Sequence, residues 1–372
     1  MDLNVSTPLV SVLLPAYNAG AHIDAAIASI RAQSFGDFEL IVVDDGSADD
    51  TLARIQAHAA EDARIRVVSR ENRGLIATLN EAIGLARGDL IARMDADDIA
   101  YPERLARQVA AFRETPGLCL CATGIDTLLR GRIVPRKPVS LLTGGAPEVL
   151  SIFYTIFLHP TLMIDRRVAG SELNYDATYP HAEDFDLIRR LTARFPVKYL
   201  PEALLAYRQH QGSVSAQHRS IMRQTHMRIV AENLAAGGFA GDLAALEDFA
   251  AAITPETARR TGALMASIRS QFRARGAGQI DSYEFGWSGL FYLIYMMFMD
   301  AGQAGLLRDF MVATDGWRLI RRREAVFLKL THAWPELAVR GLKASHALHN
   351  WAARITSRPA GTATDPLQRV PA

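Results

Sequence analysis

The chain contains only two cysteines among its 372 residues, and neither sign of charge prevails in it. Lys and Arg number 41 against 40 Asp and Glu, so the overall charge does not attract nucleic acid, and an anionic partner must be bound by a local arrangement. Cys119 and Cys121 lie two residues apart in a strand-like run, where alternation puts both side chains on one face and disfavours a disulfide between them. We therefore expect two reduced core cysteines and no nucleic-acid partner.

The chain also lacks an apolar run long enough to cross a bilayer. Its most apolar stretch, residues 287–299, is 13 residues long, and a run of this length is typical of a buried helix. Near the N-terminus, the apolar run of residues 9–14 stops at Pro15, and Asp2 stands where an export signal would be basic. These features predict a cytoplasmic protein.

Short apolar runs alternate with helically spaced segments in the first third of the chain. This alternation predicts an α/β fold with parallel strands and helices on both faces of the sheet. Ligands of such sheets bind at the carboxyl ends of the strands. Three polar clusters lie at such ends: "PAYN" (15–18), "DDGS" (44–47) and "MDADD" (94–98). The strand-like runs are 9–14, 38–45, 64–70, 90–95 and 118–124.

Beyond about residue 216 the strand signals end and the pattern becomes helical. We expect an α/β domain over residues 1–215, a helical region over 216–357 and a disordered tail over 358–372. Between residues 303 and 358, ten Arg or Lys stand against four acids and alternate with aromatic residues. Such helices can contact an anionic membrane as a peripheral protein does, and a bundle with a solvated basic face or a homo-oligomer contact explains the same composition.

The three carboxylates of "MDADD" crowd like charges within four positions. Clustered carboxylates raise one another's pKa unless a cation neutralises them, so the stretch indicates a divalent metal with oxygen ligands. A solvated turn before the helix that opens near Pro102 is the structural alternative. A calcium-binding loop is excluded, because Ala100 and Ala106 stand where that loop needs Gly and Glu.

The "DDGS" cluster contains two kinds of signal. Gly46 suits a tight turn, and Ser47 with Asp50 three residues later has the spacing of a helix capping box. Asp44 and Asp45 are not needed for that box, and an acid at a strand end can accept hydrogen bonds from a nucleobase or ribose. Further along, Arg73 precedes a helix in "ENRGL", where a guanidinium can meet a base carbonyl or a phosphate.

Together these motifs resemble the inverting glycosyltransferases of family 2, which have the GT-A fold. The resemblance rests on "SVLLPAYNAGAHIDAAIASIRAQSFGDFELIVVDDGSADDT", "NRGLIATLNEAI", "ARMDADDIAYPERL", "HPTLMI" and "AEDFDL" in this order, and it covers about residues 8–215. It implies a mostly parallel Rossmann-like sheet and transfer of a sugar from a nucleotide diphosphate donor, most commonly a UDP-sugar. The acceptor would be a hydroxyl of a carbohydrate or a lipid-linked sugar.

The resemblance also implies a role for individual residues. Asp97 would be the ligand of Mn²⁺ or Mg²⁺, with Asp98 beside it in support, and Asp184 would be the catalytic base with Glu183 as its neighbour. Arg208 would neutralise the diphosphate, and His210 would be an additional metal ligand. The remaining donor-binding positions implied are Pro15, Ala16, Tyr17, Asn18, Asp44, Asp45, Arg73 and Asp95.

Two other functions use similar residues. Sugar nucleotidyltransferases also combine an α/β fold with metal-binding acids, but they usually have a Gly-rich phosphate loop after the first strand, where this chain has "PAYNAG" without a GxG run. A non-catalytic sugar-nucleotide-binding protein would be expected to have lost the base or the metal-binding acid. Neither is missing here, so the sequence favours the transferase.

Overall fold

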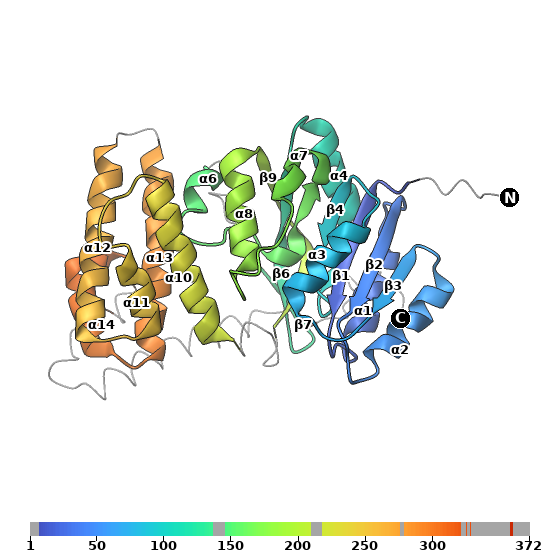
Figure 1. Cartoon of the computed structure of the whole chain (residues 1–372), viewed down its shortest axis with the longest axis horizontal. Coiled ribbons are helices and arrows are strands. Elements are labelled where there is room, and N and C mark those ends of the chain that lie inside the picture. Colours follow the sequence, from blue (N-terminus) through green and yellow to red (C-terminus); the bar gives the residue numbers. More distant parts are fainter. Residues whose placement is uncertain are drawn as a thin grey trace. The chain divides into compact units, whose positions relative to one another are not determined.

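The chain folds into two compact units (Figure 1). The structure, a computed structural model of the whole chain, describes residues 7–136, 146–209, 218–275, 279–320, 325, 328, 358 and 359. An α/β unit comprises residues 1–144, 157–213 and 357–372, and a helical unit comprises residues 145–156 and 214–356. Residues 145–156 thus belong to the helical unit, although they lie within the segment 1–215 in sequence.

The α/β unit is built on one mixed, mostly parallel sheet, which has ten strands among the described residues. Its order is β10-β7-β6-β8-β4-β1-β2-β3, and β9 pairs with both β5 and β6. The strands are β1 (Val10–Ala16), β2 (Phe38–Asp44), β3 (Ile65–Ser69), β4 (Leu90–Arg93), β5 (Ile99–Ala100), β6 (Leu120–Leu129), β7 (Arg132–Pro135), β8 (Met163–Asp165), β9 (Val197–Gln209) and β10 (Arg358–Pro359).

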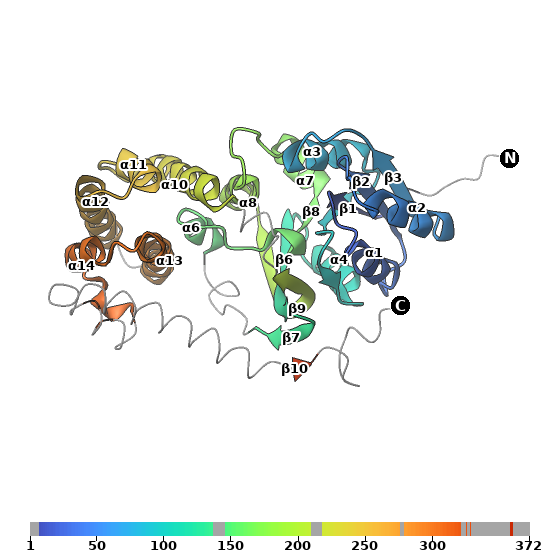
Figure 2. The same ribbon diagram turned by 90° about the horizontal axis from the view of Figure 1, so that it is seen from below.

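Helices cover both faces of this sheet, as the alternating pattern predicts. Figure 2 shows α1 and α4 on one face and α3 on the other. Strands β1 and β2 are therefore buried along their whole length, and Ile23, Ile27 and Ile30 of α1 belong to the same core. The helices and 3₁₀ turns are α1 (Ile23–Arg31), α2 (Thr51–Glu61), α3 (Leu75–Leu85), α4 (Arg104–Glu114), η1 (His159–Thr161), α7 (Arg166–Ala169), η2 (Gly170–Glu172) and α8 (Glu183–Arg194).

The sheet is parallel at one end and mixed at the other. Strands β4, β1, β2 and β3 are parallel neighbours, as expected. The run at 118–124 becomes part of β6, which is separated from β4 by the antiparallel strand β8. The run at 118–124 therefore does not pair directly with another of the predicted runs, although β6 is parallel to β9. Cys119 and Cys121 are buried and reduced, as predicted.

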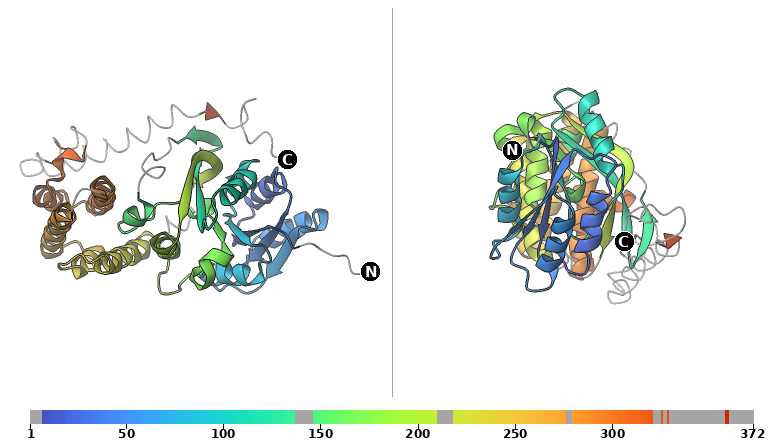
Figure 3. Two further views of the ribbon diagram at one scale, coloured as in Figure 1. Left: turned by 90° about the horizontal axis from the view of Figure 1, so that it is seen from above. Right: turned by 90° about the vertical axis from the view of Figure 1, so that its right-hand side faces the viewer.

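The helical unit contains α6 and helices α10 to α14, which gather in one bundle (Figure 3). The apolar run 287–299 lies in α13, where Trp287 is buried and donates from Nε1 to the carbonyl of Met265 at 2.9 Å. Among the described residues, none of the helices has both the length and the apolarity that a bilayer requires. The elements are α6 (Pro147–Leu150), α10 (Arg219–Ala236), α11 (Ala244–Ala251), α12 (Pro255–Ala274), α13 (Ile280–Asp300), α14 (Ala304–Ala313) and η4 (Gly316–Arg318).

Two sequence predictions fall on the C-terminal part of the chain. Arg358–Pro359, the start of the segment expected to be disordered, form β10 against β7, and residues 360–372 lie outside the described residues. Most of the basic and aromatic segment 303–358 also lies outside them, since the description there ends at residue 320 apart from a few positions.

Candidate functional site

The three polar clusters follow neighbouring strands. Strand β1 lies between β2 and β4, and all three are parallel, so their carboxyl ends meet at one edge of the sheet. The amide of Asp45 donates to the carbonyl of Ala16 at 2.8 Å, which joins the first two clusters directly. Pro15 and Ala16 are the buried last residues of β1, whereas the side chain of Tyr17 is 55% exposed immediately beyond them.

Asn18 ties the loop after β1 to the loop after β2. It has a left-handed backbone, its amide donates to Ser47 Oγ at 2.9 Å, and its Oδ1 accepts from the amide of Ala48 at 2.9 Å. The expected capping box is therefore wrong, because Ser47 bonds to Asn18 and α2 begins at Thr51 without a side-chain cap. Asn18 fixes the relative position of the two loops.

Asp44 is the buried last residue of β2. Its Oδ2 accepts from the hydroxyl of Ser69 at 3.2 Å, and its Oδ1 accepts from the amide of Ser47 at 3.4 Å. Both hydrogen bonds are longer than usual, because O–H···O bonds are about 2.5–3.0 Å long and N–H···O bonds about 2.7–3.2 Å. The carboxylate thus keeps acceptor capacity at the strand end.

Asp45, by contrast, has strong partners within the protein. It forms an ion pair with Arg70, and its two oxygens accept from the amides of Arg73 at 2.8 Å and Gly74 at 2.9 Å. These bonds fix the start of α3 and hold Arg73, whose side chain is exposed. Gly46 permits the turn, because its φ is 77° and a Cβ there would lie 2.7 Å from the amide of Asn72.

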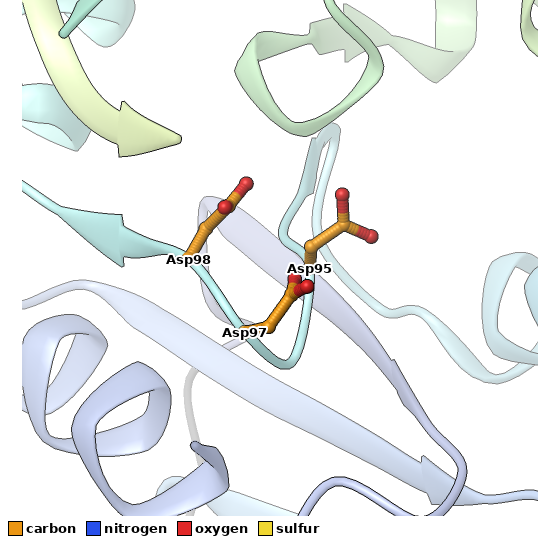
Figure 4. Close-up of side chains that lie close together, drawn as sticks. All are labelled: Asp95, Asp97 and Asp98. Carbon is orange, nitrogen blue, oxygen red and sulfur yellow. The ribbon is translucent and has the colours of Figure 1, made fainter. Parts of the chain in front are cut away.

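The acids of the third cluster lie together on the loop between β4 and β5. Carboxylate oxygens of Asp95, Asp97 and Asp98 lie within 4.8 Å of one another, and Figure 4 shows the three side chains rising from this one loop. Asp98 is fully buried, with Oδ1 accepting from the amide of Arg208 at 2.8 Å and Oδ2 without a hydrogen-bond partner in the described part of the chain. Burial, and then the charges of Asp95 and Asp97, raise the pKa of Asp98 well above its ordinary value.

This arrangement fits a hard divalent cation. The three carboxylates, each with an oxygen within 4.8 Å of the others, are the kind of ligand that Mn²⁺ and Mg²⁺ prefer, and among the described residues the buried Oδ2 of Asp98 has no hydrogen-bond partner. Arg208, near the end of β9, holds the backbone of the loop between β4 and β5, because its Nε donates to the carbonyl of Asp97 at 2.6 Å. His210, the other expected metal ligand, lies outside the described residues.

The acidic pair predicted to contain the base forms the first turn of α8. Glu183 is buried, and this burial together with the neighbouring Asp184 raises its pKa to about 7. Asp184 is half-buried, and its Oδ1 accepts from the amide of Phe185 at 2.8 Å. Burial raises the pKa of Asp184, and the Phe185 hydrogen bond and the positive charge of Arg93 oppose that rise.

Two buried arginines beside the acids escaped the sequence reasoning. Arg93, the last residue of β4, forms an ion pair with Asp95 and is only 5% exposed. Arg104, fully buried in α4, donates from Nη2 to the carbonyl of Arg93 at 2.7 Å. A basic residue at the end of the otherwise apolar "LIAR", two positions before an acid, was the available signal, since residues i and i+2 of an extended chain share a face.

A neutral polar pair lines the same region. His159 Nε2 and the hydroxyl of Tyr175 lie 2.6 Å apart, and both side chains are buried. Burial, and then Arg93, lower the pKa of His159 well below its ordinary value, and burial raises the pKa of Tyr175. Asn80 of α3 holds the backbone of Tyr175 through two hydrogen bonds of 2.8 Å.

Comparison with known proteins agrees with this geometry. The family model "Glycosyl transferase family 2" matches residues 11–142. The putative glycosyltransferase EpsE of Bacillus subtilis is 33% identical over 226 residues, which are 58% of this chain and 77% of that protein. The O-antigen biosynthesis glycosyltransferase WbnJ of Escherichia coli is 30% identical over 210 residues, which are 55% of this chain and 81% of that protein.

The fold is also found among solved structures. The crystal structure of S. aureus TarS 1–349 in complex with UDP-GlcNAc superposes with a TM-score of 0.50 at 19% identity, covering 91% of this chain and 92% of that one. The mixed sheet flanked by helices, with acids at its strand ends, is thus a GT-A-like fold of a nucleotide-sugar-dependent glycosyltransferase. The chain belongs to glycosyl transferase family 2.

Proposed function

We propose that the chain is a metal-dependent inverting glycosyltransferase. It moves a sugar from a nucleotide diphosphate donor, a UDP-sugar, to a hydroxyl of a carbohydrate or lipid-linked acceptor. The observation that carries the proposal is the triad Asp95, Asp97 and Asp98, each with an oxygen within 4.8 Å of the others, in which the buried Oδ2 of Asp98 has no partner among the residues that the structure describes. The name of the related WbnJ supports a role in bacterial polysaccharide or glycolipid synthesis.

The donor's nucleoside would bind at the ends of β1 and β2. The exposed ring of Tyr17 can stack on a base, and Asp44 can accept hydrogen bonds from the base or ribose. Pro15, Ala16 and Asn18 would shape this part of the site through their backbone, since Asn18 already ties both loops together. Asp45 would act by holding the loop of Arg73, whose exposed guanidinium can meet a base carbonyl or a phosphate.

The donor's diphosphate would bind at the acids. Asp97 would hold Mn²⁺ or Mg²⁺ with Asp98 beside it, while Asp95 binds the donor. When bound, the ion neutralises the charge that the departing diphosphate acquires. Arg208 adds a fixed positive charge next to Asp97, to whose carbonyl it donates. His210 remains a proposed additional ligand.

Asp184 would act as the base of a single displacement. Its carboxylate takes the proton of the acceptor hydroxyl while that oxygen bonds to the anomeric carbon and the bond to the diphosphate oxygen breaks. The amide of Phe185 and the charge of Arg93 both favour the ionised carboxylate that this role needs. Attack from the side opposite the leaving group inverts the configuration.

Metal-linked donor binding tests this function. Nucleoside diphosphates and their sugar derivatives are screened by thermal unfolding with and without Mn²⁺, because a ligand of the native state raises apparent stability. We expect stabilisation by a uridine diphosphate ligand that requires Mn²⁺ and is lost in Asp97→Ala. The matched control is Asp37→Ala, an exposed acid of the same unit whose carbonyl accepts from the amide of Val10 and which lies away from the three polar clusters. A wild-type protein that no nucleotide diphosphate stabilises would contradict the proposal.

Radiolabelled sugar nucleotide separates the transferase from the alternatives. A transferase should release the sugar slowly to water when no acceptor is present, whereas a binding protein leaves the donor intact. A nucleotidyltransferase would instead exchange pyrophosphate into a nucleoside triphosphate.

A further inference from the structure

Arg93 is a charged side chain in the interior of the α/β unit. Its backbone is fixed on both sides, because its amide donates to the carbonyl of Leu162 at 2.9 Å and its carbonyl accepts from Arg104 Nη2 at 2.7 Å. The residue is 5% exposed. A buried guanidinium without full compensation is costly, so its presence needs an explanation beyond packing.

The guanidinium of Arg93 is only partly paired within the protein. Its Nη2 forms the ion pair with Asp95, while Nε and Nη1 are buried and have no hydrogen-bond partner among the described residues. Most buried polar groups are hydrogen-bonded, and orphaned donors of a cation indicate a role in the site around them.

Acids from two separate elements face this cation. The charge of Arg93 acts on Asp95 and Asp98 of the loop after β4 and on Glu183 and Asp184 at the start of α8. Arg93 also acts on His159 and Tyr175, which form a pair with no charge to contribute. Tyr207 and the buried Arg104 are near it as well, and Arg104 is a second cation whose side chain donates to the carbonyl of Arg93. For Glu183 and Asp184, Arg93 is the cation that opposes the effect of burial.

We propose that Arg93 is a positioning residue of the transfer reaction. It is a built-in counter-ion that holds Asp95, and it keeps the acids of the loop between β4 and β5 (residues 94–98, called the donor loop below) close to the acids of α8 before metal and donor bind. The inference rests on the proposed function and deepens it. Arg93 joins the two halves of the site, because one guanidinium serves both the loop that binds the donor and the helix that provides the base.

A consequence for the order of binding follows. A fixed positive charge beside the acids repels a divalent cation, so Arg93 weakens the binding of metal alone. A diphosphate brings negative charge of its own and offsets that repulsion. Metal and donor should therefore bind together, with little metal bound in the absence of the donor.

The test compares Mn²⁺ binding and transfer in three proteins. Free Mn²⁺ is measured by its EPR signal in titrations of wild type, Arg93→Gln and Arg93→Lys without nucleotide, and sugar transfer is measured at saturating donor. In Arg93→Gln we expect Mn²⁺ alone to bind about tenfold tighter, since a nearby positive charge is gone. Transfer should fall on the order of 10²-fold, since the acids lose their alignment. Arg93→Lys should restore most of both properties.

The opposite signs of the two effects separate the proposal from a merely structural role. General destabilisation lowers metal binding and transfer together, and the matched control Arg66→Gln should show at most that. Arg66 also pairs with a buried acid of the same sheet, Glu39, but that acid keeps Arg87 and Ser11 as partners. Mn²⁺ binding by folded Arg93→Gln that is no tighter than wild type, or equal behaviour of the Lys and Gln variants, would overturn the proposal.

A double variant allows the same comparison if Arg93→Gln does not fold. Arg93→Gln combined with Glu183→Gln removes the cation together with one buried acid, so its thermal stability should recover. Its affinity for Mn²⁺ alone is compared with that of Glu183→Gln, and the same tenfold increase is expected. Affinities that are equal in these two proteins would also reject the role. Failure of the proposed function itself would appear separately, as a wild-type protein without Mn²⁺-linked donor binding.

Discussion

Replacing Asp45 with alanine removes the carboxylate on which the loop between β3 and α3 is built. The two amides that donate to Asp45, those of Arg73 and Gly74, would lose their acceptor, and Arg70 would lose one of its two acidic partners. Asp45 is 4% exposed, so water cannot simply take its place. We expect loss of stability in the α/β unit, and not only weaker donor binding.

The size of the effect follows from these contacts. Removing one partner of a buried ion pair costs about 3–5 kcal/mol, and each hydrogen bond to a charged group contributes about 1.5–3 kcal/mol. The losses do not add fully, because Arg70 keeps Glu81 at 2.6 Å and Thr78 at 2.9 Å and because Gly74 is exposed. We therefore expect about 3–5 kcal/mol in total, which corresponds to a fall of roughly 2 M in the urea midpoint.

The assay must report on the α/β unit alone. The segments 1–144 and 157–213 of the α/β unit contain no tryptophan, whereas Trp287 and Trp317 belong to the helical unit, so tryptophan fluorescence does not follow the α/β unit and serves as an internal control. Hydrogen exchange of peptides from β2, β3 and the loop of Arg73 should show faster exchange in Asp45→Ala. The matched control is Asp50→Ala, an exposed acid paired with Arg54, which should leave exchange unchanged. Wild-type exchange and midpoint in Asp45→Ala would refute the reasoning.

Two further predictions concern the acids at the start of α8. Asp184→Asn keeps the acceptor for the Phe185 amide but cannot take a proton. Donor affinity should therefore persist, while the rate of single-turnover transfer should fall by about 10²- to 10⁴-fold. A transfer rate within about threefold of wild type would contradict the assignment of Asp184 as the base. Glu183 has a pKa of about 7 in the folded chain against 4.5 in the unfolded chain, so the folded state binds an extra proton between these values. The free energy of unfolding should therefore fall by roughly 3 kcal/mol as pH rises from 4.5 to 7, and urea titrations of Glu183→Gln across this range should lack that fall.

Much of the α/β fold follows from local sequence. The apolar runs that form β1, β2 and β4 are buried on both faces, and such runs have little choice but a covered sheet. Strand β8 was harder to predict, because the run "HPTLMI" begins as the 3₁₀ turn η1 and leaves only Met163–Asp165 for pairing. Its antiparallel insertion between β4 and β6 depends on tertiary contacts that no local pattern encodes.

Some residues of the candidate site could likewise be predicted from the sequence, and others could not. The acids at strand ends could be found in the sequence, because crowding of like charge after an apolar run has few structural explanations. The hydrogen bond of Ser47 could not be predicted from the sequence, because its hydroxyl bonds to the amide of Asn18 and does not cap α2. Asn18 lies 29 residues earlier in the chain and becomes a neighbour only through the parallel pairing of β1 and β2. Arg93 was missed because an arginine is usually exposed, and its burial is a property of the assembled site.

The two buried arginines, Arg93 and Arg104, stabilise different parts of the donor loop. Arg104 contacts neutral groups, namely the carbonyl of Arg93, the sulfur of Met94 at 3.4 Å and Oε1 of Gln108 at 3.1 Å, so it fixes the course of the backbone. Burial lowers the pKa of Arg104 to about 10, which still leaves it charged near neutral pH. Arg93 contacts the acid itself. Because the backbone and the charges are held by different cations, the acids can stay aligned before any ligand binds, and less reorganisation remains for the moment of reaction.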